Sequence, residues 1–320
     1  MTDTENSTGA QAKSSHAGEE TFHRGEYNHA TAKAHAMFVG WVEAIQPILA
    51  THEVMSVEEE FSFPLLNPET EHPSKTFVEA GKIDGILRCR ATGAIKVLEH
   101  KTTSENVDPG SDYWARLAMD GQISKYVLAV SQGGHDVRSV VYDVAKKPGN
   151  RPLRAGKPNE ETPEEFHARC LENIREEPTA FFVQREIPRS DSDLLEYCND
   201  AWAISQEILY RRNKNLWPRN TSACTAYGQC EFFELCAGRA SVDGIRFDRN
   251  PKKHGELSIE ESGKDFLTNS RLSALRKCAR YAFLKYEEPV ERVGEKSEAL
   301  RLGLSFHRGC EIYLKTFIGK

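Results

Sequence analysis

Three residues in the first third of the chain have the types and spacing of a hydrolytic metal site. Glu99 and Lys101 lie two positions apart in the segment VLEHKT, so on an extended strand their side chains share one face while His100 points to the other. Asp84, in the segment GKIDGI, can join them from the preceding strand. The pattern predicts two carboxylates and one amine gathered at one point.

Such a group of residues is suited to the hydrolysis of phosphodiester bonds. Two carboxylates that converge in a partly buried cleft repel each other, and a hard divalent cation such as Mg²⁺ or Mn²⁺ relieves the repulsion. The backbone carbonyl of His100 offers a third oxygen ligand, and Lys101 can orient a water or stabilise charge on phosphate. The alternative is a half-exposed hairpin on which these residues merely face solvent.

Two further polar residues follow on a predicted helix. Gln122 and Tyr126, in the segment DGQISKY, are four positions apart and therefore project from one helix face. Because this helix comes after the strands that carry the carboxylates, we expect it to pack beside them. This second pair favours a catalytic site over a solvated hairpin.

Hydrophobic periodicity, with Gly and Pro between the periodic segments, predicts the elements that position these residues. The predicted order is helix, three strands, helix and strand, followed by an α-rich cover over the sheet. Helices are expected at residues 29–49, 113–130, 163–176, 191–212, 269–286 and 298–318, and strands at 54–65, 77–90, 94–102, 137–144 and 180–187.

The segments GKIDG, EHKTT and Q-x-x-x-Y together resemble the PD-(D/E)XK nuclease superfamily, and are most similar to its RecB-like exonucleases and their phage relatives. The resemblance covers most of residues 30–236. It implies an α/β fold of the restriction-endonuclease type, with an αβββαβ core and a mixed central sheet flanked by helices. It also implies that Asp84 and Glu99 bind Mg²⁺ or Mn²⁺ and that Lys101 is the catalytic lysine. Gln122 and Tyr126 would support the site and the DNA backbone.

The same resemblance implies a function on DNA. It points to exonuclease action in recombination, repair or phage DNA processing, with a helicase or recombinase as a partner. Lys146 and Lys147 are predicted to contact phosphates, and Tyr113 and Trp114 to stack on bases, although core packing suits the two aromatic residues equally well. The alternatives are a catalytically inactive DNA-binding or assembly module on this fold, and a structural protein stabilised by zinc or a cluster.

RecB-like nucleases usually carry an early G-x-x-x-H pattern whose histidine binds metal, after a segment of the type S-x-L-x-x-x-x-x-C. Here the similar segments come after the core: NSRLSALRKC, which contains Ser270 and Cys278, and LGLSFHRGCE, which contains His307. Circular permutation, a truncated second copy or a joined reading frame would each explain this order. His23, in the short echo FHRGE, is a second candidate ligand, and a surface or capping role is the alternative for both histidines.

A cysteine-rich loop precedes these segments. Cys224, Cys230 and Cys236 recur at six-residue steps, and three thiolates this close can hold zinc or an iron–sulfur cluster if a fourth ligand is available. In a subset of RecB-like nucleases, three cysteines after the core and one before it hold a [4Fe–4S] cluster, and Cys278 stands in the matching opening segment. Burial of reduced thiols is the alternative. Ordinary core roles are expected for Cys89, Cys170 and Cys198.

The composition suits an enzyme with one large core, since 39% of the 320 residues are hydrophobic and 28% are charged. The net charge of -6 means that DNA contacts must come from local basic patches. Without a long apolar run or a leader pattern, a cytoplasmic location is expected. The expected organisation is a disordered tail (1–25), a nuclease core with its cysteine-rich loop (26–240), a linker (241–265) and a helical segment resembling the family opening (266–320).

Overall fold

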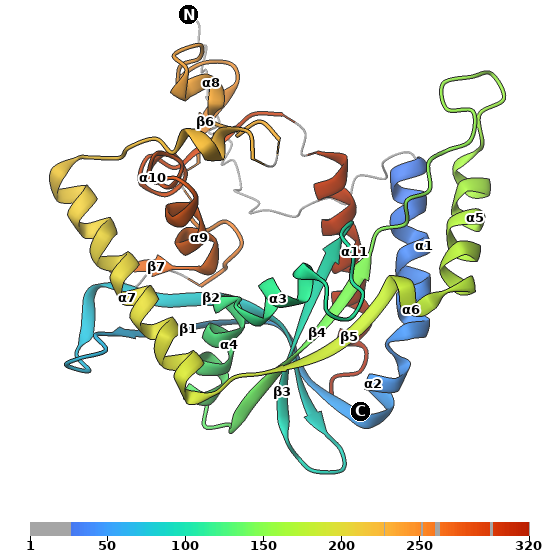
Figure 1. The fold of residues 1–320 in the computed structure, drawn as a ribbon, viewed down its shortest axis with the longest axis horizontal. Helices are drawn as coiled ribbons and strands as arrows, with labels where there is room; N and C mark the ends of the chain where they lie inside the picture. The colour runs from blue at the N-terminus through green and yellow to red at the C-terminus, as the bar shows by residue number, and fades with distance from the viewer. Residues whose placement is uncertain (1–26, 227, 251, 260–262, 295–296, 320) are drawn as a thin grey trace, which may run out of the picture.

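A mixed sheet with the strand order β1-β2-β3-β4-β5 forms the centre of the protein (Figure 1). The computed structural model describes residues 27–319, apart from 227, 251, 260–262 and 295–296. β3 and β4 pair in parallel and the other neighbours along this path are antiparallel. The strands are β1 (His52–Leu66), β2 (Pro73–Cys89), β3 (Ile95–Thr103), β4 (Val137–Lys146) and β5 (Phe182–Pro188).

The β2–β3 hairpin positions the predicted carboxylates. Its turn contains Gly93, whose φ of +74° lies in the left-handed region that glycine adopts without strain. The ladder between the two strands runs from Arg88 and Ile95 up to the pair Gly85 and Leu98, and ends there. Asp84 is the next residue of β2, so it lies where the two strands part and where backbone groups of β3 are open to a side-chain partner.

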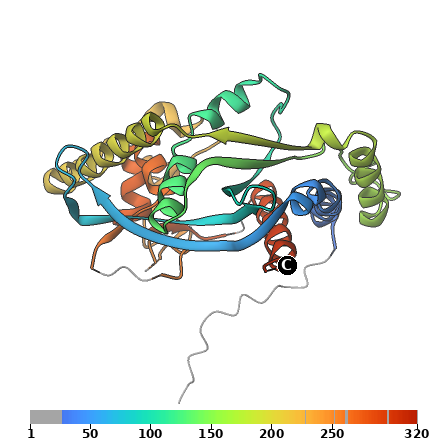
Figure 2. The ribbon, with the colours of Figure 1, turned by 90° about the horizontal axis from the view of Figure 1, so that it is seen from below.

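Helices cover both faces of the sheet (Figure 2). On one face, α1 (His29–Ala44), α5 (Pro163–Glu176) and α11 (Glu298–Lys315) share a core with the sheet that includes Trp41, Leu98 and Phe306. On the other face, α3 (Asp112–Ala118) and α4 (Gly121–Gln132) pack over Val97 and Tyr142. The short helices α2 (Gln46–Thr51) and α6 (Pro178–Phe181) connect α1 to β1 and α5 to β5.

A C-terminal lobe stands at the upper left of Figure 1, at the end of the long helix α7 (Asp191–Lys214). The short β7 (Asp265–Leu267) joins this lobe to the main sheet, because it pairs in parallel with β2. Lys125 of α4 strengthens the junction, because its buried Nζ donates to Leu267 O at 2.6 Å and lies 2.7 Å from Glu79 Oε2 of β2. The remaining elements of the lobe are the 3-10 helix η1 (Thr221–Cys224), α8 (Phe233–Cys236), β6 (Phe247–Arg249), α9 (Asn269–Lys277), α10 (Ala279–Ala282), the π-helix η2 (Phe283–Glu287) and β8 (Val290–Arg292).

The predicted αβββαβ core with its mixed sheet is confirmed. The helix expected at 113–130 is instead two helices, α3 and α4, because Asp120 starts a new helix by accepting the backbone N–H of Gln122. The predicted linker at 241–265 includes strand β6, which pairs with β8. The tail expected at 1–25 lies outside the described residues. None of the described helices has the length and apolar character needed to cross a membrane.

Candidate active site

Four of the predicted site residues form one connected network at the junction of β3 and α4. Lys101 Nζ lies 2.6 Å from Glu99 Oε1 and donates to Gln122 Oε1 at 2.9 Å. The other end of the Gln122 amide, Nε2, donates to Glu99 Oε1 at 3.0 Å and to Tyr126 Oη at 2.6 Å. The spacing of two on the strand and four on the helix therefore brings these side chains together.

Asp84 lies beside this network, at the point where β2 and β3 part. Its Oδ2 accepts the backbone N–H of His100 at 2.8 Å, in place of the ladder bond that the diverging strands no longer make. This contact fixes the carboxylate against the backbone of the residue between Glu99 and Lys101. The same contact fixes the backbone of β3 at His100, whose carbonyl oxygen was predicted to be a metal ligand.

Glu99 is in an environment that disfavours its charge. The side chain is 3% exposed, and burial, followed by the neighbouring Asp84, raises its pKa to about 8 against the opposing effect of Lys101. Its Oε2 is buried and has no hydrogen-bond partner among the described residues. A buried carboxylate oxygen without a partner is costly, and a cation would relieve that cost.

The donor set fits a hard divalent cation. The two carboxylates and the carbonyl of His100 are oxygen ligands of the kind that Mg²⁺ and Mn²⁺ prefer, and Glu99 Oε2 is the oxygen left for such an ion. Within the described ranges, no three or more His, Cys, Asp or Glu side chains are already arranged to hold a metal ion.

Lys101 stays charged in this setting. Burial alone would lower its pKa, but the charge and hydrogen bond of Glu99, followed by Asp120 and Asp84, outweigh burial and raise the pKa. Tyr126 is nearly buried, and burial followed by the charges of Glu99 and Asp84 raises its pKa well above the ordinary value. The site thus holds one cationic amine and one neutral phenol next to the carboxylates.

A second polar cluster supports β3 from the opposite face. Asp143, on β4, accepts from His100 Nδ1 at 2.8 Å and Trp41 Nε1 at 2.5 Å with one oxygen, and from Gln184 Nε2 at 2.8 Å with the other. Burial raises the pKa of Asp143, but the hydrogen bond and charge of His100 prevail and lower it. This buried carboxylate therefore holds the His100 side chain, and with it the strand between the two catalytic candidates.

The C-terminal helix α11 brings His307 to the same place. Its ring lies edge-to-face against that of His100, with centroids 6.1 Å apart. Burial lowers the pKa of His307 to about 4, although the nearby Asp84 opposes this, so the imidazole is neutral and able to bind a metal. Gly309 permits close packing of α11 on α1, since a Cβ there would lie 2.8 Å from the ring of Phe38.

The other candidate histidine ligand, His23, lies outside the described residues.

The four residues predicted to contact DNA differ in their exposure. The structure places Tyr113 and Trp114 in the core, 7% and 3% exposed, and Trp114 Nε1 donates to Val107 O at 2.7 Å. This corrects the expectation of base stacking: their apolar rings fill the space between α3 and the sheet instead. Lys146 and Lys147 are half-buried at the end of β4, and burial lowers the pKa of Lys147.

The cysteine-rich loop and the opening-like segment meet in the C-terminal lobe. Cys224, Cys230, Cys236 and Cys278 all line one cavity of about 20 Å³. Burial raises the pKa of Cys236, whose thiol is also near the other three. The cavity has room for about one water-sized particle, and the four thiols that line it are not among the described residues arranged to hold a metal ion. Cys170 is a core residue, while Cys89 and Cys198 are only half-buried.

Two acidic residues of the site were not among the sequence candidates. Asp120, the cap of α4, adds its charge to the surroundings of Glu99 and Lys101 and accepts from Tyr142 Oη at 3.2 Å. The helix-start signal of an Asp before GQISKY was visible in the sequence. Asp143 was visible as an acidic residue within the apolar run VRSVVYDV, but only the fold shows that it supports His100.

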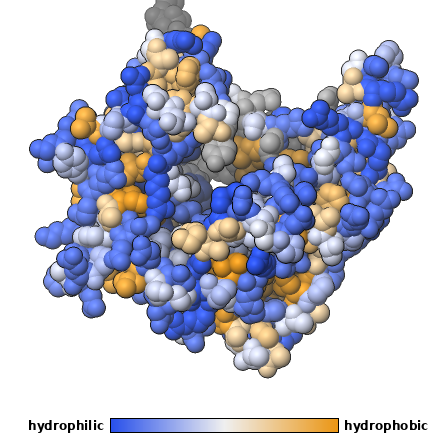
Figure 3. All heavy atoms as spheres, viewed as in Figure 1, coloured by the Kyte–Doolittle hydropathy of each residue, from blue (hydrophilic) through white to orange (hydrophobic). Residues whose placement is uncertain are grey.

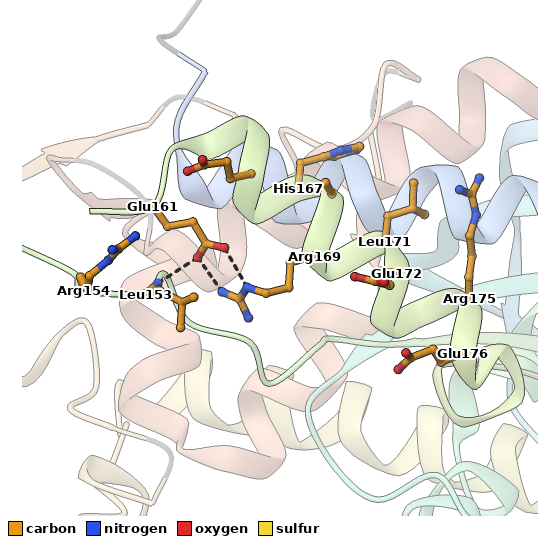
Figure 4. Close-up of a pocket in the computed structure, with 11 residues that line it drawn as sticks. Leu153, Arg154, Glu161, His167, Arg169, Leu171, Glu172, Arg175 and Glu176 are labelled. Carbon is orange, nitrogen blue, oxygen red and sulfur yellow. Dashed lines mark hydrogen bonds and ion pairs between the residues drawn. The ribbon is translucent and has the colours of Figure 1, made fainter. Parts of the chain in front are cut away.

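A large cavity lies away from these residues. It is a shallow pocket of about 1010 Å³ along the outer side of α5, lined by Arg154, His167 and neighbouring residues (Figure 4). In this pocket Glu161 pairs with Arg169 and accepts the backbone N–H of Leu153. The connected network at the β3–α4 junction remains the candidate active site.

Comparison with known protein families identifies one family over most of the chain. A family model described as the PD-(D/E)XK nuclease superfamily matches residues 5–236, a range that includes Asp84, Glu99, Lys101, Gln122 and Tyr126. No protein of curated function matches the chain. One similar solved structure is described as "Crystal structure of SSO0001", with 12% identity and a TM-score of 0.26; the match covers 52% of this chain and 56% of that one.

Proposed function

The chain belongs to the PD-(D/E)XK nuclease superfamily, and we propose that it is a Mg²⁺- or Mn²⁺-dependent deoxyribonuclease that hydrolyses phosphodiester bonds from DNA ends. The observation that carries the proposal is the buried Glu99, with one oxygen bound to Lys101 and Gln122 and the other without a partner in the described part of the chain. An inactive relative would have no need to keep an uncompensated carboxylate oxygen beside Asp84.

Each residue of the proposed site has a separate role. Asp84, Glu99 and the carbonyl of His100 would hold the cation, which when bound supplies Lewis-acid stabilisation of phosphate and eases deprotonation of water. Lys101 Nζ places a positive charge where an oxygen of the phosphate gains negative charge. Gln122 orients Lys101 by accepting from it, and Tyr126 holds the other end of the same amide.

DNA would approach from the side shown in Figure 3, where the surface is indented between the C-terminal lobe and the helices α1 and α5. The resemblance to RecB-like exonucleases supports action in recombination, repair or phage DNA processing, together with a helicase or recombinase partner. Lys146 and Lys147 remain our candidates for phosphate contacts. β4 runs parallel to β3, so its C-terminal end, which carries these lysines, lies at the same edge of the sheet as the C-terminal end of β3.

The test compares linear with covalently closed circular DNA, with Mn²⁺ or with a chelator. We expect Mn²⁺-dependent degradation of the linear form, which is lost in Asp84→Ala and Lys101→Ala. Lys96→Ala is the matched control, because Lys96 lies on the same strand but pairs at the surface with Glu186. Cleavage that persists in chelator would overturn the proposal, and DNA binding without any cleavage would favour the inactive assembly module.

We also propose that residues 266–320 are a permuted part of the nuclease core, in which His307 completes the metal site. Two contacts support this over a truncated second copy: β7 adds to the main sheet beside β2, and α11 packs on α1 with His307 against His100. The expected result is a weaker Mn²⁺ affinity in His307→Ala, measured by calorimetry. An unchanged affinity would remove His307 from the ligand set.

A second proposed metal site is the group of four thiols in the lobe, which we assign to an iron–sulfur cluster or a zinc ion. It is supported by the convergence of Cys278 with Cys224, Cys230 and Cys236 around one cavity. Metal analysis of anaerobically purified protein distinguishes the two, since a [4Fe–4S] cluster gives iron, sulfide and a brown colour. Protein free of iron and zinc, with stability unaffected by Cys236→Ser, would refute this assignment.

A further inference from the structure

The amide of Gln122 must face one way for the site to work. Its Oε1 accepts from Lys101 Nζ, and its Nε2 donates to Glu99 and Tyr126. When Glu99 is ionised, as cation binding requires, a flipped amide would put its NH₂ group against the Lys101 ammonium and its oxygen against the Glu99 carboxylate, so both contacts would become repulsive. Anything that fixes this amide therefore fixes Lys101 and Glu99 as well.

A residue of the C-terminal lobe makes a further contact with this amide. Asn269 Nδ2 donates to Gln122 Oε1 at 3.4 Å, on the same oxygen that accepts from Lys101. We propose that Asn269 is a positioning residue of the active site, which holds the Gln122 amide in its working orientation from the far end of the chain. The proposal deepens the nuclease function above and rests on it.

The start of α9 is clamped to the helix that carries Gln122. Lys125, one residue before Tyr126 on α4, is fully buried, pairs with Glu79 Oε2 at 2.7 Å and donates to Leu267 O at 2.6 Å. Leu267 ends β7, and Thr268 then caps α9 by accepting from the backbone N–H of Arg271. Asn269 is the first residue of this helix, and it lies two residues after the backbone carbonyl that Lys125 of α4 holds by a buried hydrogen bond.

The space around the contact explains why the contact is needed. A cavity of about 170 Å³ lies between β2, α4 and the start of α9, and Gln122, Tyr126, Asn269 and Ser270 are among its lining residues. Gln122 thus borders open volume, which leaves space beside its amide. A side-chain donor from α9 supplies a restraint on the amide.

The test uses three variants of the full chain. Asn269→Ala removes the donor. Asn269→Asp keeps the shape but places a carboxylate against Gln122 Oε1, and an acidic residue in the first turn favours the helix. Ser270→Ala is the matched control, because Ser270 lines the same cavity but hydrogen-bonds Tyr286 instead of Gln122.

We expect kcat to fall about tenfold in Asn269→Ala and further in Asn269→Asp, with KM for DNA unchanged and Asn269→Asp as heat-stable as the wild type. Ser270→Ala should cleave at the wild-type rate. A purely structural role for Asn269 predicts the reverse ranking, with Asn269→Asp the milder change. Unchanged kcat in both Asn269 variants, or an equal loss in Ser270→Ala, would overturn the proposal.

A double-mutant cycle of Asn269→Ala and Gln122→Ala, with Mn²⁺ affinity as the readout, tests this proposal separately from the nuclease function. Asn269→Ala should weaken Mn²⁺ binding several-fold in the wild type, because Glu99 is less well held, and should have no effect in a Gln122→Ala background. This readout needs no cleavage. A wild type that binds Mn²⁺ without cutting DNA would refute the nuclease proposal, while equal effects in both backgrounds would refute the role of Asn269.

Discussion

Glu99→Gln should change how the stability of the metal-free protein depends on pH. Burial and Asp84 raise the pKa of Glu99 from 4.5 to about 8 in the folded protein. Between these values the folded protein keeps a proton that the unfolded chain has released, so the free energy of unfolding falls as pH rises. The slope is about 1.4 kcal/mol per pH unit, or about 3 kcal/mol between about pH 5.5 and 7.5.

The glutamine variant cannot ionise at this position, so it should lack this part of the pH dependence. Urea unfolding of both proteins in chelator, followed by circular dichroism at several pH values, gives the difference directly. The stability of Glu99→Gln relative to wild type should rise by about 3 kcal/mol over the interval. Glu105→Gln is the control, because Glu105 is exposed and pairs with Arg116 at the surface. Parallel curves for Glu99→Gln and wild type would refute the reasoning about the buried carboxylate.

Three further changes test other parts of the structure. Lys101→Met should lower kcat by at least about a hundredfold and leave Mn²⁺ binding in place, as measured by single-turnover cleavage and calorimetry. Lys125→Met should destabilise the protein by about 3–5 kcal/mol in urea unfolding, because it leaves the buried Glu79 without its cation, and the double variant with Glu79→Gln should recover much of the loss. Gly309→Ala should cost about 1–3 kcal/mol and weaken Mn²⁺ affinity, because its Cβ would press on Phe38 and displace α11; unchanged affinity would show that α11 does not deliver a ligand.

Much of the central sheet and site could be predicted from local patterns. The period of two that set Glu99 and Lys101 on one face, and the period of four that paired Gln122 with Tyr126, are properties of a strand and a helix, and they needed no knowledge of the rest of the fold. The strands from 54 to 102 were found within a few residues of their true ends, because alternation and turn residues mark them clearly.

Other features depended on contacts between distant segments. Asp143 supports His100, and Asn269 contacts Gln122, across 43 and 147 positions of sequence, so no spacing rule reveals either contact. The break between α3 and α4 was missed because the apolar pattern continues through it, while the Asp120 cap decides the boundary. The sequence left the roles of Tyr113 and Trp114 open for a related reason, since an aromatic residue at helical spacing suits a core and a binding surface equally, and their burial favours the core.

The central claim is that Asp84 and Glu99 hold the divalent cation with which Lys101 acts on DNA. The most direct test measures the rate of linear DNA degradation against Mn²⁺ concentration for the wild type and for Asp84→Asn at constant pH. We predict saturable, Mn²⁺-dependent cleavage by the wild type, and for Asp84→Asn either no cleavage or cleavage that needs far more Mn²⁺. Equal rates and equal Mn²⁺ dependence in the two proteins would contradict the claim.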